Sequence, residues 1–98
     1  MNLKGFEYSV HCNYEGVPMS FHARNGAEFV GLRSVIGGRR QVVYDARTGK
    51  RVVLDIRDVS ATDDDINSAL KEGINARNVL GGVLAALKAR NIDVDFAS

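Results

Sequence analysis

Stretches of alternating apolar and polar residues, separated by glycine-containing turns, constrain the fold of this 98-residue chain most strongly. Residues 6–14 read FEYSVHCNY and residues 17–23 read VPMSFHA, and in both the apolar side chains recur at every second position. A period of two is typical of a half-buried β-strand, because successive side chains in a strand point to opposite faces. Glu15 and Gly16 between the two stretches predict a hairpin with a two-residue turn.

The parity of this hairpin predicts which of its residues share a face, since a one-residue slip would reverse every side chain. The predicted pairs are Cys12 with Met19, Val10 with Phe21, His11 with Ser20, Ser9 with His22, and Glu7 with Arg24. Regular alternation then places Cys12 in the core. The opposite, polar sheet face carries Ser9, His11, Ser20 and His22. We therefore expect a buried thiol that contacts neither histidine.

A metal site in the same hairpin is not expected. His11 and His22 are predicted to be diagonal neighbours on one face, close enough to bind one zinc or copper ion. A third ligand is missing, because Glu7 lies two rows from His11 and the neighbouring serines are poor ligands.

Two further hairpins are predicted, with turns at Gly37-Gly38 and at Gly49. Three-residue loops give the cleaner pattern here, and Gly49 suits the left-handed bulge position. The second loop pairs Tyr44 with Val52, Val42 with Leu54, and Asp45 with Arg51. The core face of these strands then carries Val30, Leu32, Ile36, Val42, Tyr44, Val52, Leu54 and Ile56.

Two helices are predicted after the strands. Thr62 is a favourable N-cap, and the three aspartates that follow it, Asp63 to Asp65, suit the exposed amides of a first helical turn. Gly73 is expected to end this helix, and Asn75 to cap a second helix over residues 76–90. The stretch IDVDF at residues 92–96 alternates again and predicts a last short strand.

The predicted fold class is therefore α+β: an antiparallel β-meander of about five strands followed by two helices on one sheet face, in a single domain over residues 1–98. The apolar fraction of 45% and the charged fraction of 26% match an ordinary globular chain. The longest apolar stretch, residues 79–87, is too short to span a membrane, and no targeting signal is evident at the start. One cysteine fits a reducing compartment, so a cytoplasmic location is expected.

The basic residues concentrate in the middle of the chain, where residues 33–57 hold seven cations against two aspartates. Arginine binds phosphates and carboxylates with two parallel hydrogen bonds, so this segment is the strongest candidate for partner binding. Three valines on the face opposite the predicted core also need a covering, from this chain or from another. The candidate partner-binding residues are Arg33, Val35, Arg39, Arg40, Val43, Arg47, Lys50, Arg51, Val53 and Arg57.

No catalytic motif is present, and nothing in the sequence calls for a cofactor. We expect a small non-catalytic binding or regulatory module that acts through protein–protein contacts. It would be a homo-oligomer, an inhibitor or an adaptor, including an accessory protein of a phage or mobile element. The alternative is a nucleic-acid-binding protein that uses the arginine-rich hairpins. A platform of exposed aromatic residues for stacking bases is not expected, because Phe6, Tyr8, Tyr14, Phe21 and Tyr44 all fall on the predicted core face.

Overall fold

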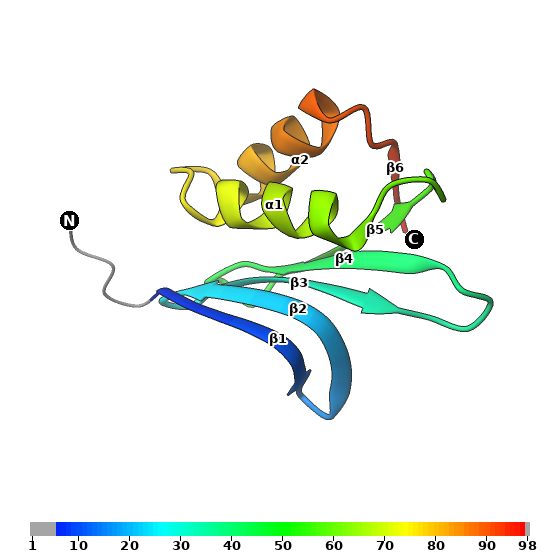
Figure 1. Cartoon of the computed structure of the whole chain (residues 1–98). Coiled ribbons are helices and arrows are strands. Elements are labelled where there is room, and N and C mark those ends of the chain that lie inside the picture. Colours follow the sequence, from blue (N-terminus) through cyan, green and yellow to red (C-terminus); the bar gives the residue numbers. More distant parts are fainter. Residues whose placement is uncertain (1–5, 98) are drawn as a thin grey trace.

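Six strands follow one another in chain order across one antiparallel sheet, and two helices cover one of its faces (Figure 1). The computed structural model describes residues 6–97. The strands are β1 (Phe6–Tyr14), β2 (Val17–Asn25), β3 (Glu28–Ser34), β4 (Arg40–Asp45), β5 (Arg51–Ile56) and β6 (Val94–Phe96). The predicted α+β meander is confirmed, and the short C-terminal stretch forms the sixth strand.

The turns and registers agree with the hairpin predictions, except that the predicted pair of His11 and Ser20 is not part of the β1–β2 register. Glu15 and Gly16 both have positive φ, 52° and 78°, as the two-residue turn between β1 and β2 requires. The register pairs Cys12 with Met19, Ser9 with His22, Tyr44 with Val52, and Asp45 with Arg51. Turn chemistry therefore fixed the strand pairing correctly.

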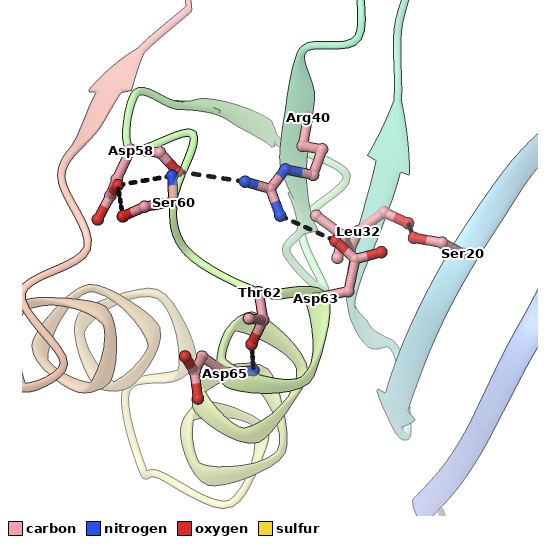
Figure 2. A network of polar contacts seen from close by, with 8 residues as sticks. All are labelled: Ser20, Leu32, Arg40, Asp58, Ser60, Thr62, Asp63 and Asp65. Carbon is pink, nitrogen blue, oxygen red and sulfur yellow. Dashed lines mark hydrogen bonds and ion pairs between the residues drawn. The ribbon is translucent and has the colours of Figure 1, made fainter.

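The helices are α1 (Asp63–Ile74) and α2 (Val79–Ala89). Thr62 caps α1 as predicted, because its hydroxyl oxygen accepts a hydrogen bond from the Asp65 backbone N–H at 3.1 Å (Figure 2). The predicted start of the second helix is wrong, since Asn78 is its N-cap and accepts from the Gly81 N–H at 3.0 Å.

Gly73 does not end α1 but lies inside it, where its Cα faces Val83 of α2. A Cβ atom at this position would lie 2.7 Å from both the backbone nitrogen and the Cα of Val83. The glycine is therefore required by helix packing, and the helix continues through Ile74 to a C-cap at Asn75.

The main core lies between the helices and the sheet. Its largest fully buried members are Phe21, Val30, Leu32, Val42, Leu54, Ile66, Leu70, Ile74, Val79, Val83 and Leu87. Ile36 was expected here but is 98% exposed, because Ser34 and Arg40 form the last β3–β4 pair and the connecting residues 35–39 extend beyond the sheet. Among the described residues, no helix is long and apolar enough to cross a membrane.

The outer part of β1 was also expected to face the core, but Tyr8 and Val10 are 47% and 59% exposed. Helix α1 packs over β2 and β3, and its Lys71 ammonium lies 5.7 Å from both the Tyr8 and the Phe21 ring centroids. The helical layer therefore ends at this lysine and leaves the edge strand partly uncovered.

The turn end of the β1–β2 hairpin bends away from the helices (Figure 1). Phe21 packs beneath the helices, whereas Met19, two residues earlier on the same strand, packs on the opposite face. Regular alternation would put both on one face, so the alternation is broken between them. In β1 the break coincides with His11, whose φ of 58° lies in the left-handed region that few non-glycine residues adopt.

This bend builds a second, smaller core on the face away from the helices. Met19, Phe29 and Val43 are its buried members, and Cys12, Tyr14, Val17 and Val53 pack against them. The Tyr14 and Phe29 rings stack with centroids 3.8 Å apart. Cys12 and Tyr14 therefore lie on the face opposite the one predicted, although the predicted register is right.

Candidate binding groove

The arginine-rich segment does not form a free basic surface, because most of its guanidinium groups have partners within the chain. Arg40 donates to the Asp63 carboxylate at 2.9 Å and to the Asp58 carbonyl oxygen at 3.2 Å (Figure 2). Its side chain is only 16% exposed. Arg40 thus ties β4 to the start of α1 and is a structural residue.

Carboxylates also neutralise the arginines at the other end of the sheet. Arg51 bridges Asp45 and Glu15, with nitrogen–oxygen distances of 2.7 and 2.6 Å. Burial raises the pKa of Asp45, but hydrogen bonds from Arg51 and Tyr14 outweigh it and hold that pKa below its ordinary value. Two further pairs are Arg47 with Glu28 at 3.8 Å, in which the arginine is exposed and Glu28 is mostly buried, and Arg57 with Asp95 at 3.3 Å, which is exposed on both sides.

Three cations of the segment have no carboxylate partner among residues 6–97. Lys50 and Arg39 are exposed, and their side chains form no hydrogen bond or ion pair there. Arg33 donates twice to the Gln41 side-chain oxygen, at 3.1 and 2.9 Å, and Gln41 donates in turn to Asp55 at 2.8 Å. A neutral amide cannot balance the charge of Arg33, so its guanidinium stays available to an anion.

The structure brings two of these cations together in a groove of about 740 Å³ at the β5 and β6 end of the sheet. The groove is lined by the cations Arg33, Lys50 and Arg51, by Gln41, and by the apolar residues Val52, Val53, Leu80, Phe96 and Ala97. None of these lining residues is acidic. Four of the predicted partner-binding residues, Arg33, Lys50, Arg51 and Val53, therefore share one site.

At this groove, the outer edge of β5 is only partly paired by residues 6–97. The Val53 carbonyl accepts from the Ala97 N–H at 2.8 Å, and the Arg57 N–H donates to the Asp93 carbonyl at 3.0 Å. Because backbone groups alternate in direction along a strand, the N–H and C=O of Arg51 point to the same outer edge. β6 pairs only with Leu54 to Ile56, so no described residue continues the ladder past Val53.

The remaining predicted partner residues do not line the groove. Val43 is 3% exposed under the chain's own β1–β2 hairpin, which leaves it no surface to offer another molecule. Val35 and Arg39 lie in the β3–β4 connection, at the other end of β4 from the turn that carries Lys50. The sheet face opposite the helices, which was expected to need a covering, is therefore covered at Val43 by this chain itself.

Cys12 lies against His22, and the expectation that no such pair forms is wrong. The sulfur and the imidazole Nδ1 are 2.5 Å apart, because the bend at His11 turns Cys12 toward the face that carries His22. Of the expected polar face of Ser9, His11, Ser20 and His22, His11 is exposed and lines one shallow hollow with Ser20, whose hydroxyl donates to the Leu32 carbonyl oxygen at 3.0 Å.

The electrostatics of the Cys12–His22 pair do not suit a nucleophile. Burial raises the pKa of the Cys12 thiol, and burial together with Arg24 lowers the pKa of His22. Both shifts favour the neutral forms, whereas a preformed thiolate–imidazolium pair would need the opposite shifts. Among the described residues, no three His, Cys, Asp or Glu side chains are grouped so as to hold a metal ion.

Sequence reasoning missed the apolar part of the groove. Phe96 ends the edge strand and is 64% exposed, and Leu80 reaches the groove from α2. The signal for Phe96 was its place at the end of a three-residue strand, where a large aromatic cannot be covered from both sides. Leu80 was assigned to the second helix, but its proximity to Phe96 depends on tertiary packing.

No protein-family model matches this chain, and no curated protein or solved structure shows significant similarity to it.

Proposed function

We propose that this protein is a small non-catalytic binding module that engages another protein chain through the groove between β5, β6 and α2. The observation that carries the proposal is the convergence of Arg33, Lys50 and Arg51 with the exposed Phe96 on one open site. Arginine and aromatic residues are enriched at protein interfaces, where they combine charge recognition with burial of apolar area.

The neutral Cys12–His22 pair supports a binding role over a catalytic one. Catalytic groups need pKa values near neutral pH for proton transfer or nucleophilic attack. In this pair the pKa of Cys12 is raised and that of His22 is lowered, so both move away from neutral pH. The groove itself contains cations and an amide but no residue that could act as a general base near neutral pH.

Nucleic-acid binding is the second candidate, and the position of Phe96 favours it. An exposed aromatic beside cations is the arrangement on which single-stranded bases stack. The internal ion pairs of Arg40, Arg47, Arg51 and Arg57 weigh against it, because they lower the positive charge available to a phosphate backbone.

Capture of partners from a lysate of the source cell tests the proposal, with the wild-type chain and the Lys50→Glu variant compared. The matched control is Arg39→Glu. This substitution also reverses the charge of an exposed cation whose side chain has no described partner, but Arg39 lies far from the groove. We expect one protein species to be retained by the wild type and by Arg39→Glu and lost with Lys50→Glu. Equal retention by all three would place the interaction elsewhere.

Retention of RNA or DNA at low salt separates the second candidate from the first. Binding through phosphates weakens steeply as salt rises, because bound counterions are released on association. If nucleic acid were retained with this salt dependence and lost with Lys50→Glu, the second candidate would replace the first.

A further inference from the structure

We propose that the occupant of the groove is an acidic, extended peptide segment that adds a short strand to the open edge of β5, in line with β6. This inference rests on the proposed function and specifies the chemistry of the partner. Strand addition uses backbone hydrogen bonds for affinity and alternate side chains for specificity.

The charge of the groove selects an anionic partner. The Lys50 ammonium has no partner among the described residues, and the Arg33 guanidinium is bonded only to the neutral Gln41 side chain. Arg51 keeps its own two carboxylates, so the free positive charge of the site comes from the other two cations. Carboxylates of a bound segment would be attracted by both cations, which line the same groove.

The backbone of β5 supplies the pairing groups. Arg51 directs its N–H and C=O outward, and the Val53 N–H points to the same edge. β6 ends at Phe96, and Ala97 makes the last described bond of the ladder, so none of residues 6–97 occupies the next position along this edge. A peptide running antiparallel to β5 would occupy that position.

The alternate side chains of such a peptide meet different surfaces. On one side lie Val52, Leu80 and Phe96, which form an apolar wall. On the other side lie Arg33 and Val53. An alternating sequence of acidic and apolar residues matches both sides, because successive strand side chains point to opposite faces.

The test uses a fluorescent hexapeptide that alternates glutamate and valine, with anisotropy measured at low salt. Three probes serve as controls: a hexapeptide that alternates lysine and valine, an oligothymidine strand, and the acidic peptide with alternate amides N-methylated. N-methylation keeps the charge but removes donors that a strand pair needs. We expect binding of the acidic peptide alone, and a loss of about tenfold or more with Lys50→Glu.

Protein variants and amide exchange locate the bound peptide. Phe96→Ala should weaken binding about fivefold, whereas Val59→Ala, which truncates an exposed side chain outside the groove, should not. The Arg51 and Val53 amides should become protected from hydrogen exchange when the peptide is bound. Protection elsewhere, or equal binding of the N-methylated peptide, would overturn strand addition.

Failure of the inference can be told from failure of the proposed function. If no peptide binds while a cellular protein is still captured through Lys50, the proposed binding function is supported and the acidic-strand inference is wrong. If oligothymidine binds and the acidic peptide does not, the groove is a nucleic-acid site and both fail.

Discussion

The carboxylate of Glu15 lies 2.6 Å from a guanidinium nitrogen of Arg51, although 36 positions separate them in the sequence. Glu15 is in the turn of the first hairpin and Arg51 begins β5, so the contact joins the hairpin tip to the far side of the sheet. Arg51 also bonds Asp45 at 2.7 Å and lines the groove. One arginine thus fastens the bent hairpin and borders the candidate binding site.

Glu15→Gln removes the charge of this contact while leaving a side chain of the same size. Both partners are substantially exposed, so we expect the free energy of unfolding to fall by only about 0.5–1 kcal/mol. Denaturant titration at low and at 1 M salt checks this, because salt screens exposed ion pairs. A loss of the same size at both salt concentrations would contradict an electrostatic role.

Gly31→Ala and Gly73→Ala compare the cost of a methyl group that meets a flexible side chain with the cost of one that meets a backbone. A Cβ at Gly31 would lie 2.5 Å from the flexible end of Met19, and we expect a loss of about 1–2 kcal/mol. A Cβ at Gly73 would meet the backbone of Val83, which cannot move aside, and we expect about 3 kcal/mol or more. Denaturant unfolding measures both losses.

A double variant tests whether Met19 causes the cost at Gly31. Gly31→Ala combined with Met19→Ala should cost less than the sum of the two single changes, because the shortened side chain leaves room for the new methyl group. Strict additivity would show that Phe29, whose ring is the next nearest neighbour, causes the cost instead.

His22 predicts a pH dependence of stability. Burial and Arg24 lower its pKa in the folded chain, so the unfolded chain takes up a proton at higher pH than the folded one. The free energy of unfolding is therefore maintained above about pH 6.5, the ordinary histidine value, and falls as pH drops below it. His22→Gln should reduce this fall between about pH 7.5 and 5.5, a window above the titration of ordinary carboxylates. An unchanged slope in the variant would assign the effect to other groups.

Tyr44→Phe removes a hydroxyl that donates to the Glu28 carboxylate at 2.7 Å. Burial and this hydrogen bond raise the pKa of Tyr44 to about 12. We expect the free energy of unfolding of the variant to fall by about 1–2 kcal/mol. The absorbance change from ionisation of the Tyr44 phenol near this pH should also be absent. A phenolate signal of unchanged size in the alkaline titration would show that Tyr44 does not ionise in this range.

The first hairpin shows how far sequence patterns reach. Its turn and its register follow from Glu15-Gly16 and from parity, because both depend on residues near each other in the chain. The faces of Cys12 and Met19 were wrong, because the prediction assumed an unbroken period of two. Histidine is among the residues that tolerate the left-handed region, but nothing local demands that conformation at His11.

By itself, the sequence determined the α+β class, the order and pairing of the strands, and the cap at Thr62, because alternation, turn residues and capping are local properties. Only the tertiary structure decided which arginines keep a free charge and which face Cys12 occupies. Arg40 and Asp63 lie 23 positions apart, and Glu15 and Arg51 still further, so their pairing depends on how the sheet bends and where the helices settle. The groove at Lys50 and Phe96 has the same origin, since segments distant in sequence form it when they pack.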